Sequence, residues 1–479
     1  MVSDTLDDTA SPGALAQREA LRRGEVSARE LTEAAIASAD RHRHLGTFVS
    51  LEAELALNEA DEADRLIAAT PLDERHILPL LLGLPTAHKD LVRVRGFTTT
   101  HGSAAVPHLR ATHDDPIPAI VRDAGAICIG KTQVPEFGIA GYSENLIAAP
   151  ARNPHDPERS AGGSSGGTAA AIASGTITAA IASDAGGSIR IPSAACGLIG
   201  LKPGRDTVPA DQLLLGASTA DADPLAPPRL GVSGPIARTA SDAALFYDAI
   251  TASSAAGSPP LEPALAALQR AHELRGLRIG VSFASPFESA MPIEFDEAAR
   301  SAVARAARRL TGAGHHVDEA TIAYDPAYPE FFTTVWTRAL LTIPLEPAAE
   351  AQLGTLARWF LEQARATPAD TVAAALAQLH RFIDDTTAQW GAYDLVLTPA
   401  LAFTAPSIGD FWQGSPADDY RLQCEWAPQT SLVNVVGVPA ITVPMSVDPD
   451  GLPRGVQLIG RAGSEVTLLQ VAEVLSSSR

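Results

Sequence analysis

The chain has 479 residues, of which 46% are hydrophobic and 19% charged, and its formal net charge is −20. This composition is typical of globular domains and excludes a disordered chain. The acidic balance and the absence of Lys/Arg clusters disfavour nucleic acid as a partner, because affinity for the phosphate backbone depends on such clusters.

Targeting, membrane and metal patterns are missing from the sequence. Residues 1–13 are acidic and polar, unlike a signal peptide, and no apolar run reaches the roughly 18 residues of a membrane span. The three cysteines, Cys128, Cys196 and Cys424, lie far apart without the spacing of metal ligands. We expect a cytoplasmic protein with no membrane partner, no disulfide framework and no metal.

The first predicted elements are helices. Between residues 12 and 65 apolar residues recur at helical spacing, and Ser27 with Glu30 three residues later forms a capping-box pattern. Two or three surface helices are predicted here.

After Pro71 short apolar runs bounded by Gly, Pro, Asn and Asp alternate with Ala-rich stretches, which is typical of an α/β domain. Two irregular stretches, 204–230 and 252–263, have the composition of loops or linkers. Because strand patterns continue beyond both, we favour one sheet with insertions. The predicted strands are 77–82, 127–130, 176–183, 277–282, 316–320, 395–398, 440–444 and 455–459.

The most informative segment is 160–203, in which four glycines surround Ser164 and Ser165. An Ala-rich helix is predicted over 168–174, with Gly175 as its stop, so the serine pair precedes a helix. The strand over 176–183 then runs into the sequence DAGGS, residues 184–188. A strand end followed by glycines can expose successive N–H groups, as an oxyanion hole requires.

Three interpretations of the glycine–serine run are open at this point. The glycines and serines can simply form turns and helix caps. A phosphate-binding loop is disfavoured because its GK[ST] ending is absent. Residues 162–166 fit the G-x-S-x-G nucleophile elbow, but a Pro-rich polar loop precedes them where that motif requires a strand.

The chain resembles the amidase signature family over roughly residues 20–475. The glycine- and serine-rich signature of the family is similar to residues 161–203 almost throughout, and its lysine motif to residues 83–90. Shorter similar motifs occupy 130–132, 135–137, 143–145, 152–154, 234–238 and 434–460.

The resemblance implies an α/β amidase signature fold, in which one large twisted mixed β-sheet is flanked on both faces by α-helices. It also implies a single amidase domain over 1–479. Within it we expect N-terminal helices in 1–70, the catalytic signature core in 71–203 and a loop-rich insertion in 204–265. The rest of the sheet and the substrate pocket would follow in 266–479.

The resemblance further implies a Ser-Ser-Lys triad: Ser188 as nucleophile, Ser164 as bridging serine after a cis peptide bond, and Lys89 as base. A lysine acts as a base only when burial lowers its pKa, and Lys89 follows an apolar run. Taken alone, Lys89 could instead be a surface lysine paired with Asp90. His88, where the family usually has an aliphatic residue, could add a titration near pH 6.5.

The remaining site residues also follow from the resemblance. The N–H groups of Ala185, Gly186, Gly187 and Ser188 would hold the oxyanion, and no cofactor would be required. Ser165 would form a hydrogen bond within the site, and Asp184 with Arg190 a supporting ion pair. Cys196 is an alternative thiol nucleophile, although a buried core cysteine is the simpler interpretation. We expect the substrate at the segment 138–142, with Gly138, Ile139 and Tyr142, at the loop around 204–230, and at the aromatic-rich stretches 331–336 and 411–426.

Two classes of function follow. The first is a free-standing hydrolase of neutral amides, extending to anilides, carbamates or esters, whose partner is the small-molecule amide or carbamate itself. The alternative is the glutamine amidotransferase subunit of a tRNA-dependent complex, although residues 410–440 differ from the Tyr- and Asp-rich segment expected of that subunit. A homodimer is compatible with the first class.

Overall fold

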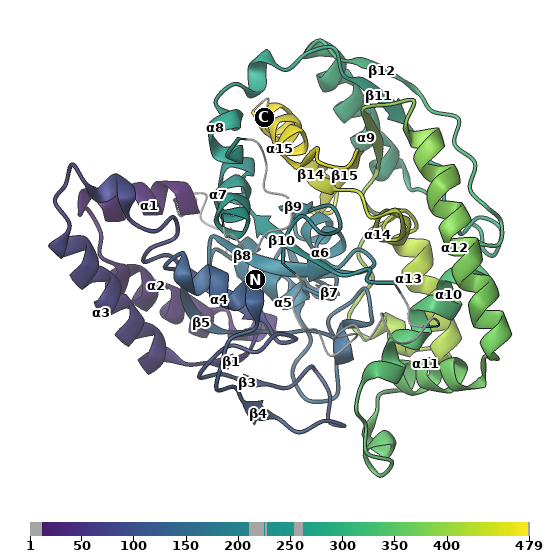
Figure 1. The fold of residues 1–479 in the computed structure, drawn as a ribbon, viewed down its shortest axis with the longest axis horizontal. Helices are drawn as coiled ribbons and strands as arrows, with labels where there is room; N and C mark the ends of the chain where they lie inside the picture. The colour runs from purple at the N-terminus through teal and green to yellow at the C-terminus, as the bar shows by residue number, and fades with distance from the viewer. Residues whose placement is uncertain (1–11, 210–224, 226–227, 253–261, 478–479) are drawn as a thin grey trace.

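Three helices begin the described chain and form one flank of the molecule (Figure 1). The computed structural model describes residues 12–209, 225, 228–252 and 262–477. The helices are α1 (Ala14–Arg23), α2 (Ala28–Arg41) and α3 (Ala53–Ala69). Ser27 accepts a hydrogen bond from the Glu30 N–H, and the Glu30 carboxylate accepts one from the Ser27 N–H at 2.8 Å. The predicted helices and capping box are therefore confirmed.

The centre of the molecule is an eight-stranded mixed sheet. Its parallel part pairs β11 with β12 and with β13, and the remaining neighbours are antiparallel. In spatial order the strands are β12 (His316–Glu319), β11 (Arg278–Val281), β13 (Leu395–Pro399), β15 (Pro453–Gly460), β14 (Ala440–Val447), β9 (Ile199–Lys202), β10 (Val232–Ala237) and β8 (Ala179–Asp184).

Helices cover both faces of this sheet. Successive residues of a strand point to opposite faces, so neighbouring residues of one strand contact different helices. Ile441 and Val443 of β14 join an apolar cluster with α7 (Ala240–Thr251), α9 (Glu297–Gly312) and α15 (Glu465–Ser476). On the other face, Gln457 of β15 contacts α6 (Arg190–Ala195), with α14 (Ser431–Val436) beside it. The expected α/β fold, a large mixed sheet flanked by helices, is confirmed.

A second, three-stranded sheet brings the lysine motif to the edge of the first. It consists of β1 (Phe48–Leu51), β5 (Ile127–Thr132) and β2 (Pro85–Lys89). Thr86 Oγ1 of β2 donates to the Ala179 carbonyl of β8 at 3.0 Å. The first residues of β2 and β8 are therefore neighbours.

The strand predictions need correction in two respects, one predicted strand that is absent and several strands that were missed. Residues 77–82 are not a strand: a 3₁₀ turn ends at Ile77, and the leucines that follow are held in turns by Pro79 and by Gly83, whose φ is +79°. The apolar run therefore precedes β2. Strands β1, β2, β9 and β10 do not appear among the predicted strands. In β10, Gly234 and Pro235 are residues typical of turns.

The remaining elements surround these two sheets. In Figure 1 a helical layer stands on the side opposite α1–α3, and it contains α10 (Tyr328–Arg338), α11 (Thr355–Ala366), α12 (Ala369–Trp390) and α13 (Pro416–Trp426). The others are α4 (Pro116–Asp123), α5 (Gly166–Ala173), α8 (Ala264–Leu268), β3 (Thr98–Thr99), β4 (Leu109–Arg110), β6 (Arg152–Asn153) and β7 (Asp156–Ser160).

Most of the two stretches predicted to be irregular falls on residues 210–224, 226–227 and 253–261, which lie outside the described residues. Among the helices that the structure does describe, none combines the length and the apolarity needed to cross a membrane.

Candidate active site

The serine pair lies at the start of α5, as predicted. The peptide bond between Gly163 and Ser164 is cis, and a side chain at Gly163 would overlap the main chain of Tyr142. Gly175, with φ +75°, follows the helix end. Ser165 Oγ donates to the Ser183 carbonyl at the long distance of 3.5 Å, so Ser165 forms a contact within the site.

Lys89, the last residue of β2, reaches Ser164. Its Nζ donates to Ser164 Oγ at 2.7 Å and lies 3.2 Å from both the carbonyl oxygen and Oγ of Ser183. The Lys89 and Ser164 residues are 3% and 1% exposed. Burial lowers the pKa of Lys89 to about 7, against a smaller raising effect of Asp184. A neutral amine, able to accept a proton, is therefore well populated near neutral pH.

The alternative pairing of Lys89 with Asp90 at the surface is wrong. Asp90 is fully buried and accepts from Lys131 Nζ at 3.1 Å. The preceding residue, His88, is buried too, and burial together with the charge of Lys131 lowers its pKa to about 3. His88 is therefore neutral throughout the physiological range, which corrects the expected titration near pH 6.5.

Ser188 follows the end of β8 and opens onto a cleft. The predicted oxyanion donors require one correction: the Gly187 N–H donates to Asp184 Oδ1 at 2.7 Å and is already engaged. The N–H groups of Ala185, Gly186 and Ser188 have no acceptor within the part of the chain that the structure describes. Three of the four predicted donors thus remain available.

The buried ion pair of Asp184 and Arg190 fixes this strand end. Arg190 Nη2 lies 2.9 Å from Asp184 Oδ1, and both side chains are fully buried. Burial alone would raise the pKa of Asp184, but the guanidinium outweighs it and holds the pKa well below the usual range. Arg190 also donates to the Gln457 Oε1 at 2.7 Å and to the Asn434 Oδ1 at 2.6 Å.

Asn434 and Gln457 were not predicted as site residues. Asn434 Nδ2 donates to the Asp184 carbonyl at 2.9 Å, so α14 and β15 both hold the segment that carries Ser188. The only signal in the sequence was the family-like stretch 434–460, which gives no role to either side chain.

The cleft beside Ser188 has a volume of about 500 Å³, including space open to solvent. Gly138 and Ile139 line it as predicted. Its wall also includes residues from both expected aromatic-rich stretches and from the segment after β8. Besides Gly138, Ile139 and Ser188, the lining residues are Ala140, Gly141, Gly186, Ile191, Phe287, Phe332, Trp336, Tyr420, Gln423, Cys424, Ala427, Thr430 and Ser431.

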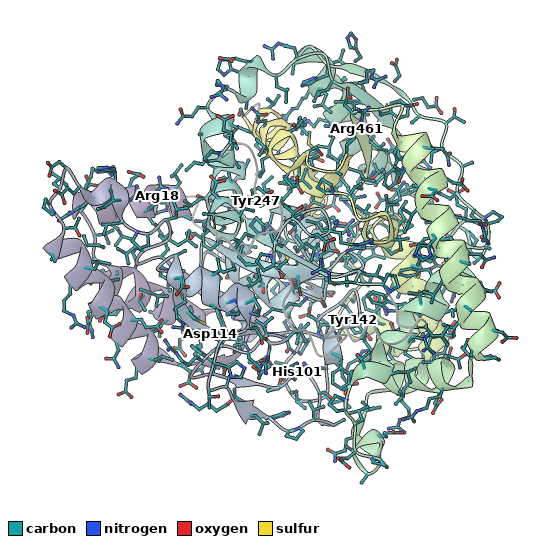
Figure 2. The ribbon with its side chains drawn as sticks, viewed as in Figure 1. Arg18, His101, Asp114, Tyr142, Tyr247 and Arg461 are labelled. Carbon is teal, nitrogen blue, oxygen red and sulfur yellow. The ribbon has the colours of Figure 1, made fainter. Side chains whose placement is uncertain are left out.

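Tyr142 is not among these lining residues, which corrects the prediction that it binds substrate. Figure 2 shows Tyr142 between the central sheets and the helical layer that contains α13. Its ring stacks on Phe411 at 4.3 Å, and its hydroxyl donates to Asp419 Oδ2 at 2.7 Å. Gln423 donates to the same carboxylate at 2.7 Å and accepts from the Gly141 N–H at 2.8 Å. Tyr142 therefore supports the wall from behind.

The thiol alternative fails. Cys196 is 1% exposed and follows the C-terminal end of α6, where the helix dipole does not favour a thiolate. Burial raises the pKa of the Cys196 thiol far above its ordinary value. Among the described residues no group of three or more His, Cys, Asp or Glu side chains could hold a metal ion.

Comparison with known proteins identifies the family of this chain. The Amidase family model matches residues 30–469, so the chain belongs to the amidase signature family and is an amide-hydrolysing enzyme. It is 34% identical to the putative amidase AmiB2 of Mycobacterium tuberculosis, over 98% of this chain and 97% of that protein.

Two further relatives bear on the function. The chain is 32% identical to a glutamyl-tRNA(Gln) amidotransferase subunit of Synechococcus sp. (strain WH7803), over 95% of this chain and 94% of that protein. Among solved structures it is similar to 6-aminohexanoate cyclic dimer hydrolase complexed with substrate, with a TM-score of 0.83, 27% identity and coverage of 98% and 97%.

Proposed function

We propose that this amidase cleaves the C–N bond of carboxylic amides through Ser188, Ser164 and Lys89. The observation that carries the proposal is the 2.7 Å hydrogen bond between the buried Lys89 Nζ and Ser164 Oγ, beside the strand end that leads to Ser188. A serine hydroxyl needs a base to become a nucleophile, and a lysine with a pKa near 7 is suited to that role.

In the first half-reaction, neutral Lys89 takes the proton of Ser164 while Ser164 takes that of Ser188. Ser188 Oγ then bonds to the carbonyl carbon, and the N–H groups of Ala185, Gly186 and Ser188 donate to the oxyanion. Lys89 then returns its proton to Ser164, and Ser164 gives its own proton to the leaving nitrogen. The C–N bond breaks, and an acyl-enzyme remains. Water attacks this ester by the same relay, which releases the carboxylate product and restores Ser188.

The described cleft wall favours a neutral substrate. It contains no Asp, Glu, Lys, Arg or His among the described residues. Glutamine carries an ammonium and a carboxylate, each of which costs desolvation unless a charged partner compensates. The wall therefore supports hydrolysis of neutral amides, and by the same carbonyl chemistry of anilides, carbamates or esters. The sequence identity to the amidotransferase subunit keeps glutamine amidotransfer as the second candidate.

Labelling and turnover by the purified full chain test the proposal. A fluorophosphonate should modify Ser188, and Ser188→Ala should lose both labelling and amide hydrolysis while keeping the melting temperature. Ser165→Ala is the matched control, because Ser165 neighbours Ser164 yet makes only a long contact to a carbonyl. Labelling of Ser165, or turnover by Ser188→Ala, would refute the assignment. Ammonia release from glutamine in preference to neutral amides would favour the second candidate.

A further inference from the structure

Helix α10 presents an aromatic surface to the cleft. Phe332 and Trp336 are one helical turn apart, and their rings stack with centroids 5.7 Å apart and planes at 25°. Phe287 packs edge-on against Phe332 at 6.2 Å. Phe287 and Phe332 are 2% and 3% exposed, whereas Trp336 is only half-buried. The indole therefore has surface free for a ligand, and Phe332, itself packed against Phe287, supports it.

Trp336 lies next to the reacting groups. A Cβ added to Gly186 would be 3.3 Å from Trp336 Cη2, so the six-membered edge of the indole is close to the main chain that carries the oxyanion donors. Gly186 and Ser188 both line the cleft with Trp336. A group attached to a carbonyl held at Ser188 is thus within reach of the indole.

Three polar side chains of the wall, Thr430, Ser431 and Gln423, are already engaged with the protein. Thr430 Oγ1 donates to the Gly186 carbonyl at 2.7 Å, and Ser431 Oγ is 2.9 Å from the Tyr328 hydroxyl. Gln423 is shared between Gly141 and Asp419. Ile139 and Ile191 add apolar surface. A charged substituent entering this space would lose hydration without gaining an oppositely charged partner among the described lining residues.

We propose that the preferred substrates are neutral amides with a bulky apolar, preferably aromatic, group on the acyl side, and that Trp336 is the residue that selects for it. This inference rests on the proposed function. An aryl group would stack on or against the indole, whereas a short alkyl group would leave that surface uncovered. Differences of this size in an apolar pocket are worth roughly 10- to 200-fold in kcat/KM.

The test compares three primary amides: 3-phenylpropanamide, butyramide and the anionic succinamate. Wild type should prefer 3-phenylpropanamide to butyramide at least about 10-fold in kcat/KM, with succinamate the poorest substrate. Trp336→Ala should remove most of that preference by raising KM for 3-phenylpropanamide, and it should lower kcat/KM for butyramide by a clearly smaller factor. Trp336→Phe should restore part of the preference. Thr334→Ala, on the same helix but outside the cleft lining, should behave as wild type.

Equal losses on both neutral amides in Trp336→Ala would show a structural role and overturn the inference, as would an unchanged preference. Fluorophosphonate labelling of Ser188 separates this result from failure of the proposed function. If Ser188 is labelled and butyramide or succinamate is the better substrate, only the present inference is wrong. If Ser188 is not labelled and no amide is cleaved, both are wrong.

Discussion

The protonation of Lys89 should set the acidic limb of the pH profile. Burial lowers the pKa of Lys89 from its ordinary value of 10.5 to about 7, which corresponds to roughly 5 kcal/mol against the charged form. Only the neutral amine can accept the Ser164 proton. The kcat/KM for a neutral amide should therefore rise with pH to a plateau above about 8, with about one tenth of the plateau value at pH 6.

Steady-state kinetics between pH 5 and 9 measure this limb. Lys89→Ala should lower kcat by roughly 10² to 10⁴ or more, as expected for the loss of a general base. His88→Val is the matched control, since His88 is adjacent in the chain but buried and neutral above about pH 3. It should keep both the limb and the plateau. An active Lys89→Ala together with an inactive His88→Val would refute the reasoning.

The same pKa predicts a change in stability that does not depend on activity. The unfolded chain holds the Lys89 proton up to pH 10.5 but the folded chain only up to about 7, so folding releases a proton in this window. Wild-type stability should rise with pH there. Lys89→Met removes the free energy that folding spends on deprotonating or burying the Lys89 ammonium. The gain in melting temperature over wild type should therefore be largest below pH 7 and disappear towards pH 10.5. A gain that is independent of pH would show that Lys89 is not the titrating group.

Four further predictions concern the surroundings of the triad. Asp184→Asn should lower the free energy of unfolding, measured by denaturant titration, by about 3–5 kcal/mol, because it leaves the Arg190 charge buried and unpaired. The double variant Asp184→Asn/Arg190→Met should recover part of this loss. Gly187→Ala should lose stability and activity, because at φ +131° an alanine is strained by roughly 1–3 kcal/mol and its Cβ would clash with Thr430. Gly276→Ala is the control and should lose much less stability, because Gly276 has φ +73° and open space around it. Burial raises the pKa of Asp419 to about 6, so wild-type stability should fall as pH rises from 3.8 through 6, and Asp419→Asn should gain melting temperature relative to wild type at pH 8 but not at pH 4. Cys196→Ala should keep full amide hydrolysis, and loss of turnover without loss of folding would revive the thiol alternative.

Sequence patterns predicted the local parts of this structure well. The capping box of Ser27 and Glu30 uses groups three residues apart, and the helix stop at Gly175 needs only a residue that tolerates positive φ. The segment of residues 161–203 identified the family because its glycines and serines lie at short, fixed spacings. The apolar run before Lys89 indicated burial, and burial is what lowers the pKa of Lys89.

Turn residues and short apolar runs gave the errors in the fold. Residues 77–82 have the composition of a strand but pack as turns, while β10 is a fully buried strand in spite of Gly234 and Pro235. For β10 the partners decided the outcome, because it pairs with β8 on one side and β9 on the other. Strand pairing is a long-range contact that local composition does not report.

By itself the sequence determined the family, the α/β class, and the segments from which Lys89, Ser164 and Ser188 come. Only the tertiary structure decided that Asp184 accepts from the Gly187 N–H and that the Tyr142 hydroxyl donates to Asp419. It also brought Asn434 into contact with Asp184, 250 residues away in the chain. The physical reason is that each of these hydrogen bonds depends on the direction of one side chain relative to another element. A sequence pattern places a residue on an element, whereas packing between elements decides which group it meets.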